Sequence, residues 1–328
     1  MRVTCVGAAL AGAWLLVAPA AVAPAAADSG PDGFTITDPR IAESSGLAAS
    51  RLHPGVYWTH NDSGDGPYLY AVDSRTGKTV ARVTMKGVGA PRDVEAISLG
   101  PDGDLYVGDI GDNLDGSWDH VWIYRLPEPE KLHDQVVRAT QYTVKYADGP
   151  RNAEALMVHP KTGRVYIADK KEDGGHLYEG PAKLSTGGVN VFRRVAATEL
   201  WVTDGAFSPD GKRLALRGYF GGILFDWRKN RPVRHGRLRV PLQGQGESVT
   251  FTPDGKHLMY GSEGRNSEVV PGPVPGEGGG SGKGGGGADA GGDAGPPLPG
   301  GGFGKGALVV VAVLAALWGL KRLLRKAR

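Results

Sequence analysis

The stretch EAISLGPDGDLYVGDIGDN, which runs from Glu95 to Asn113, decides the fold. It holds two runs of alternating apolar residues, separated by the turn sequence PDG at residues 101–103. In such a turn, proline presets the backbone angle, aspartate bonds back to the chain and glycine accepts a positive φ. The stretch therefore predicts a β-hairpin whose second strand ends in the acidic sequence GDIGDN, residues 108–113.

The same unit recurs along the chain, so the hairpin is one repeat of a larger fold. The other copies are SSGLAASRLHPGVYWTHNDSGD from Ser44, EALMVHPKTGRVYIADKKED from Glu154, DGAFSPDGKRLALRGYFGG from Asp204 and ESVTFTPDGKHLMYGSEGRN from Glu247. Third strands are expected at residues 68–72, 121–125, 176–180 and 222–227, and fourth strands at 79–85, 141–146, 189–195 and 237–241. Four antiparallel strands repeated at intervals of roughly 43 to 59 residues predict an all-β protein with a single β-propeller.

The number of units predicts five blades. The fifth unit has no clear fourth strand, and the sequence GFTIT at residues 33–37 could supply it by pairing with the last blade. This pairing would close the ring and cover an edge that would otherwise expose unpaired backbone groups. A ring of six blades, one of them degenerate, remains the alternative.

Acidic residues recur at equivalent places in these units. In a propeller the first strand of each blade lies innermost, so strand-one starts and strand-two ends lie together near the axis. Glu95, Glu154 and Glu247 each stand six residues before the turn proline, whereas Asp204 stands five before its own. The first unit has Ser45 at the aligned place and Glu43 two residues earlier, on the same side of a strand.

Carboxylates crowded at one mouth of the channel repel each other, and they need protons or a cation. Carboxylate and amide oxygens suit Ca²⁺ or Mg²⁺ rather than zinc. The alternative is that these acids are strand-end residues that bond backbone amides between blades. The sequence leaves both interpretations open.

The segments ESSGL, HNDSGD, EAIS and GDIGDN resemble the secreted calcium-dependent propellers of the phytase-like and gluconolactonase-like groups, and the SPDGK and TPDGK turns resemble those of WD-repeat propellers. The resemblance covers about residues 40–266 and implies a divalent cation held by acids at the channel mouth. It also implies, for some members, hydrolysis of phosphoesters or lactones. The ligands it implies are Glu95, Asp109, Glu154 and Glu247, with Asp62 and Glu43 as second choices. The chain departs from those groups in having five units instead of six, and no cluster of lysine and arginine for phytate phosphates stands beside the acids.

Both ends of the chain differ from the middle. Residues 1–27 have the basic start, apolar core and small final residues of a signal peptide, with an uncleaved anchor as the alternative. Residues 28–270 are the predicted propeller, and 271–302 are a linker rich in glycine and proline. The apolar segment 303–320 predicts a transmembrane helix, followed by a basic cytoplasmic tail at 321–328. An amphipathic helix and a wall-sorting signal are the alternatives, although LPGGG at residues 298–302 lacks the sorting threonine.

These features predict a single-pass protein of the cell membrane with the propeller outside. Cys5, within the signal peptide, is the sole cysteine, so no disulfide is expected in the mature protein. The composition resembles that of high-GC actinobacteria. Dispersed basic residues and a net charge of +3 argue against a nucleic-acid partner.

Two functions remain open, and the sequence does not decide whether the protein is an enzyme. The first is a membrane-anchored module that binds an extracellular ligand or protein. The second is a metal-dependent extracytoplasmic hydrolase of phosphoesters or lactones. The sequence contains no nucleophile elbow, P-loop or H-E-x-x-H motif, and a single histidine, His60, stands beside Asp62.

Overall fold

The computed structural model describes residues 30–114 and 116–276. Within these ranges the chain consists of strands and turns. No helix in this part of the chain is long and apolar enough to cross a membrane. The predicted signal peptide, transmembrane helix and basic tail, with the linker from residue 277 on, lie outside the described residues.

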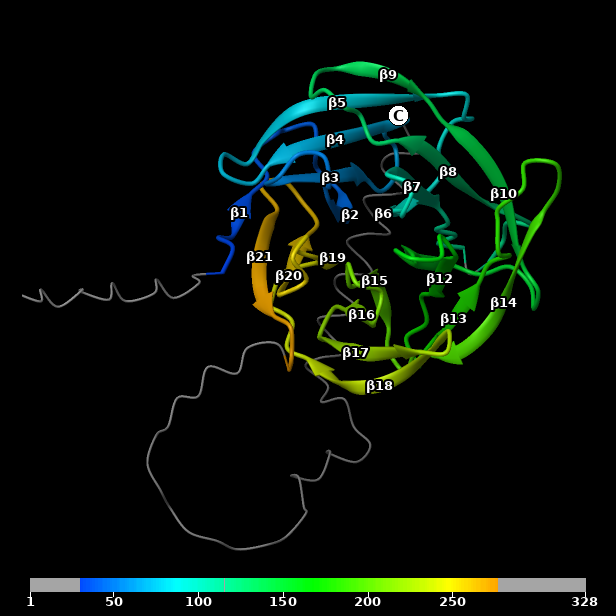
Figure 1. Ribbon diagram of the computed structural model, residues 1–328. Helices are drawn as coiled ribbons and strands as arrows, with labels where there is room; N and C mark the ends of the chain where they lie inside the picture. The colour runs from blue at the N-terminus through cyan, green and yellow to red at the C-terminus, as the bar shows by residue number, and fades with distance from the viewer. Residues whose placement is uncertain (1–29, 115, 277–328) are drawn as a thin grey trace, which may run out of the picture. The chain divides into compact units, whose positions relative to one another are not determined.

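The strands follow the repeat of the sequence, and Figure 1 shows them arranged as sheets around a common axis. The first unit holds β2 (Ser44–Ala49), β3 (Val56–Asn61), β4 (Tyr68–Asp73) and β5 (Lys78–Lys86). The second holds β6 (Val94–Leu99), β7 (Asp104–Asp109), β8 (Val121–Pro127), β9 (Gln135–Arg138) and β10 (Thr140–Tyr146). The third holds β11 (Ala153–Val158), β12 (Val165–Asp169), β13 (His176–Glu179) and β14 (Asn190–Ala197). The fourth holds β15 (Val202–Phe207), β16 (Arg213–Gly218), β17 (Gly221–Arg228) and β18 (Arg231–Leu238), and the fifth holds β19 (Gly246–Phe251), β20 (His257–Ser262) and β21 (Glu268–Pro273).

The arrangement of the first strands makes the fold propeller-like. β2, β6, β11, β15 and β19 contact one another in that order, and β19 contacts β2 again. The pairing expected for the N-terminal segment is confirmed: β1 (Phe34–Thr35) lies antiparallel to β21, with Phe34 opposite Val269. The first and last parts of the described chain therefore share one sheet, in the order β1-β21-β20-β19.

The core lies between neighbouring sheets, because the inner strands are buried on both faces, whereas outer strands such as β18 are largely exposed. Trp58, Leu105 and Tyr124 belong to one such layer, which joins the first and second units, and all three are fully buried. The turns predicted from the sequence form as expected, since Gly103, Gly211 and Gly255 all have a positive φ. The repeated hairpins and the residue types in their turns thus determine the fold.

The structure differs from the sequence-based expectation in the fourth unit. Its last strand, β18, begins at Arg231 instead of residue 237. Lys229 and Asn230 both have a positive φ, which makes a two-residue hairpin turn directly after β17. Proline is disfavoured within a central strand, but an outer strand such as β18 tolerates Pro232.

Further differences concern the outer edges of the sheets. No pattern in the sequence indicated β9, which pairs parallel to β5. In addition, β10 pairs parallel to β14, so the sheets of the second and third units are continuous. At the C-terminal side, β21 extends to Pro273, and Val274 is buried, so the first residues of the predicted linker belong to the last sheet.

Candidate functional site

The recurrent glutamates lie on irregularities at the start of the innermost strands. Val94 and Ala96 pair with Asp109 and Gly108 in succession, which leaves Glu95 without an opposite residue. Glu154 in β11 and Glu247 in β19 are skipped in the same way. A β-bulge of this kind re-aims one side chain without ending the strand.

The position of the bulge also explains why the side chain of Asp204 points in a different direction from those of the three glutamates. In β15 the skipped residue is Thr203, which stands six residues before the turn proline like the glutamates. Asp204 follows the bulge, and its carboxylate accepts bonds from the backbone N–H groups of Gly205 and Val249 at 2.7 Å each. The offset seen in the sequence therefore corresponds to a different direction of the side chain.

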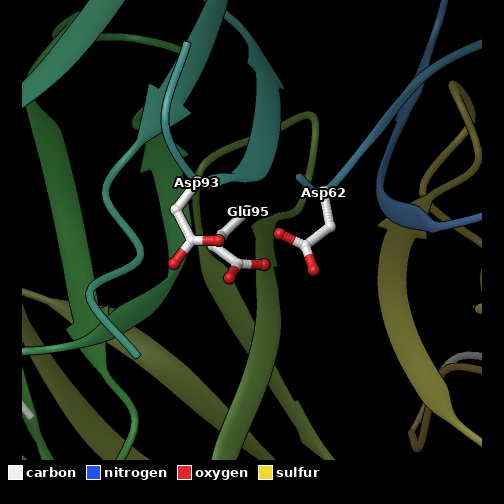
Figure 2. A group of neighbouring side chains, drawn as sticks. All are labelled: Asp62, Asp93 and Glu95. Carbon is white, nitrogen blue, oxygen red and sulfur yellow. The ribbon is translucent and has the colours of Figure 1, made fainter. Parts of the chain in front are cut away.

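Three carboxylates meet where the first and second units join. Figure 2 shows Asp62, Asp93 and Glu95 pointing toward one another, and one oxygen of each lies within 4.8 Å of the others. Asp62 follows β3, whereas Asp93 directly precedes β6 and Glu95 lies in it. The backbone N–H of Val94 donates to the carbonyl of Asp62 at 2.9 Å, which fixes the two segments against each other.

The GDIGDN sequence builds the support of this cluster. Asp109 accepts bonds from the N–H of Asp93 at 2.9 Å and from the hydroxyl of Tyr124 at 2.5 Å, so it holds the backbone that carries Asp93. Asn113 donates from its amide to Asp93 Oδ2 at 2.9 Å. Gly111 leaves the space that the acids occupy, because a Cβ there would lie 2.7 Å from both Asp93 Oδ2 and Glu95 Oε1.

The acids hold protons more tightly than usual. Burial and the charge of Asp93 raise the pKa of Asp62 well above its ordinary value, and a hydrogen bond between the two carboxyls adds to this. Burial and the charges of Asp62 and Glu154 likewise raise the pKa of Glu95. Ser45 donates its hydroxyl to Glu95 Oε2 at 3.0 Å. Asp62 and Glu95 therefore favour their protonated forms more than free carboxyls do, and a bound cation would oppose this.

A second group of side chains lies on the side of the third and fourth units. Lys170 Nζ lies 2.8 Å from Glu154 Oε1 and donates to the hydroxyl of Tyr219 at 3.1 Å. Burial raises the pKa of Glu154 to about 7, against the opposing effect of Lys170, and Glu247 raises it further. Burial alone would lower the pKa of Lys170, but Glu154, Tyr219 and Glu247 raise it well above its ordinary value. Lys170 thus remains charged and balances one of the acids.

The six residues expected as metal ligands take different places. Glu95 and Asp62 belong to the three-acid cluster. Glu43 lies beside it, since its carbonyl accepts from the N–H of Asp62 at 2.9 Å and its charge raises the pKa of Asp62. Glu154 pairs with Lys170. Glu247 is buried, and its Oε2 has no hydrogen-bond partner among the described residues.

Asp109 takes the role that the alternative interpretation gave to strand-end acids, because its carboxylate binds backbone N–H groups and a tyrosine hydroxyl. His60 is 1% exposed, and burial lowers its pKa to about 4, so its ring is neutral inside the sheet.

Asp93 is the member of the cluster that the sequence-based expectation missed. It stands two residues before Glu95, as Glu43 stands two before Ser45. Asn152 and Gln245 hold the same place before Glu154 and Glu247. The spacing that indicated Glu43 also points to Asp93, because residues i and i−2 lie on one side of a strand.

Fold and site together define a propeller-like all-β protein with a cluster of acids at the inner ends of its strands. No protein-family model matches the sequence, and no curated protein matches it. Among solved structures, the chain is similar to hydrazine synthase of Kuenenia stuttgartiensis, with TM-score 0.38 and 18% identity over 69% of this chain and 57% of that chain. A mitotic checkpoint complex gives TM-score 0.38 and 15% identity over 70% and 63% of the two chains. The PQQ-bound aldose sugar dehydrogenase of Streptomyces coelicolor gives TM-score 0.42 and 13% identity over 72% and 95%. The chain thus covers less than two thirds of the length of the first two of these solved structures.

Proposed function

We propose that the protein is a five-bladed β-propeller that binds a ligand through a divalent cation, Ca²⁺ before Mg²⁺, at the acid-rich mouth of its channel. The observation that carries this proposal is the meeting of Asp62, Asp93 and Glu95, with one oxygen of each within 4.8 Å of the others. A single cation with oxygen ligands at about 2.3–2.6 Å can bridge such a group.

The charge balance supports a cation. Six acids influence one another here, namely Glu43, Asp62, Asp93, Glu95, Glu154 and Glu247, and two buried basic side chains act against them, Lys170 and Arg217. While no cation is bound, the acids can reduce their mutual repulsion only by binding protons. A divalent cation would replace the shared protons and relieve the repulsion.

The donor set favours a hard cation with open positions. Carboxylates and the hydroxyl of Ser45 provide oxygen donors, and the described residues bring no thiolate to the site. With one oxygen from each, the three carboxylates supply fewer than the six to eight oxygens that Ca²⁺ takes. The remaining positions are available to water or to oxygen atoms of a ligand, which links the cation to a binding function.

The composition of segments 1–27 and 303–328 supports a place for this module at the membrane. The signal-like start and the apolar segment 303–320 with its basic tail support a membrane-anchored protein whose propeller lies outside, where it meets an extracellular ligand or protein. Protease added to intact cells should then cut the linker and release the propeller. Protection of the propeller until the membrane is broken would contradict this topology.

Calcium titration of the purified full-length protein tests the cation site. We expect Ca²⁺ to raise the melting temperature and to release protons, because the raised pKa values of Asp62 and Glu95 mean that bound protons must leave. Asp93→Asn should abolish both responses, whereas Asp32→Asn, which changes an exposed acid, should leave them intact. If wild type and Asp93→Asn respond alike, the site is wrong. Calcium-dependent turnover of phosphoesters or lactones would favour the hydrolase instead.

A further inference from the structure

The outer part of the fourth unit carries an unusual concentration of positive charge. The sequence RKNRPVRHGRLR, residues 228–239, contains six lysines and arginines and no acid. All six are exposed, and we call them the arginine ridge: Arg228, Lys229, Arg231, Arg234, Arg237 and Arg239. The expectation that basic residues are dispersed through the middle of the chain does not hold here.

The ridge follows β18, which forms the outer edge of its sheet. In the other units the outer strand pairs with a further strand: β5 with β9, β10 with β14, and β21 with β1. In the part of the chain that the structure describes, β18 pairs with β17 alone. The longest open edge at the periphery is therefore also the most basic one.

The positive charges of the ridge are only partly balanced. Arg228 and Arg231 stand directly opposite each other across the hairpin, with Lys229 in the turn between them, an arrangement in which like charges repel. Asp226 pairs with Arg228 at 2.8 Å and Glu199 with Arg234 at 2.8 Å. Among the described residues, no acid forms an ion pair with Lys229, Arg237 or Arg239.

Charge on an edge strand can serve merely to prevent pairing with another sheet. β18 already has two other devices for that purpose, the missing donor of Pro232 and a bulge that leaves His235 without an opposite residue. A chain that needed protection alone would not need six cations as well. The same two devices disfavour the addition of a peptide strand to this edge.

We propose that the arginine ridge binds a linear polyanion whose charges are carried by phosphate groups. Five of its six cations are arginines, whose planar guanidinium groups bind phosphate through two parallel hydrogen bonds. The eight residues of β18 span roughly 26 Å, so the ridge presents a row of charges rather than a pocket for one anion. The two aromatic residues opposite β18, Phe225 and Trp227, are both buried, so neither offers the ridge a surface on which nucleic-acid bases could stack.

This surface lies on the outer strand of a blade and is independent of the cation site. The full-length protein and fluorescently labelled long-chain inorganic polyphosphate test it at low and moderate salt. The test variant carries Lys229→Gln, Arg237→Gln and Arg239→Gln. The control variant carries Lys78→Gln, Lys86→Gln and Arg138→Gln, which remove the same charge from exposed positions on β5 and β9.

We expect the test variant to lose at least tenfold in affinity at low salt and the control variant to lose less than twofold. The slope of log affinity against log salt should fall by about 2 in the test variant, since each phosphate contact contributes about 0.7 for a single-stranded polyanion. Equal losses in both variants, or no binding of polyphosphate at low salt, would overturn the proposal. Pyrophosphate binding as tightly as the polymer would also overturn it, as would tighter binding of anionic lipid vesicles or of single-stranded DNA through the same residues.

Discussion

Replacing Gly111 with alanine should remove the proposed cation site and leave the fold intact. The φ of Gly111 is not positive, so alanine can adopt its backbone conformation. The new Cβ would lie 2.7 Å from Asp93 Cγ and Oδ2 and 2.7 Å from Glu95 Oε1. Both contacts are with side chains that belong to the cluster, so the substitution acts on the acids and on little else.

The size of the effect follows from these distances. Ordinary contact of a Cβ begins near 3.4 Å, so the two carboxyl groups must retreat by about 0.7 Å. Bonds to Ca²⁺ vary only between about 2.3 and 2.6 Å, so such a shift is more than the site tolerates. A cation at a hundredfold excess over its dissociation constant stabilises the folded state by about 2.7 kcal/mol. Losing it lowers the melting temperature in calcium by roughly 5 to 11 °C.

Thermal unfolding in calcium and in chelator measures this difference. The matched control is Gly89→Ala, because a Cβ at Gly89 would meet nothing within 4 Å and its φ is not positive either. We expect the calcium response to disappear in Gly111→Ala and to persist in Gly89→Ala. A full calcium response in Gly111→Ala would show that the cation binds elsewhere.

Three further results are expected. Because the pKa of Glu154 is raised to about 7, the folded state holds that proton more tightly than the unfolded one. In chelator, the free energy of unfolding should therefore fall as pH rises from about 4.5 through 7, by on the order of 3 kcal/mol, and Glu154→Gln should flatten this dependence in chemical denaturation. Replacing Lys170 with methionine leaves the Glu154 carboxylate without its ammonium partner. The substitution should destabilise the protein by about 3–5 kcal/mol at pH 8, where Glu154 is ionised, and much less at pH 5. Equal losses of stability at the two pH values would contradict the pairing. Deleting residues 33–41 removes β1 together with the buried Ile36 and Ile41. This deletion should lower the melting temperature measured by calorimetry by roughly 10 °C. An unchanged transition would mean that β1 does not hold the ring closed.

The sequence predicts the hairpins well because their signals are local. The turn around Gly103 needs only proline, aspartate and glycine in the right order, and its positive φ follows. The pairing of residues 33–37 with the last unit was predictable from a count of strands, because the fifth unit has no clear fourth strand of its own. By contrast, β9 depends on contacts with β5 that no local pattern encodes. The early start of β18 was hidden because Lys229 and Asn230 are an uncommon pair for a tight turn.

The site was only partly predictable, for a physical reason. Repetition indicated the bulged glutamates, because each blade places the same residue near the axis. It did not indicate which acids face one another across two blades. Asp109 and Asp93 look alike in sequence, yet one carboxylate binds backbone N–H groups and the other meets Glu95 and Asp62. That choice depends on the packing of neighbouring sheets.

The most direct test of the account is the metal content and calcium stoichiometry of the purified full-length protein. The Asp62–Asp93–Glu95 cluster predicts one tightly held Ca²⁺ per chain, detected by elemental analysis after dialysis and by calorimetric titration of the chelator-treated protein. The same measurement on Asp93→Asn should give no bound calcium at an unchanged fold. A wild-type protein that binds neither Ca²⁺ nor Mg²⁺, and that melts identically in calcium and in chelator, would contradict the cation site and leave GDIGDN as a structural turn.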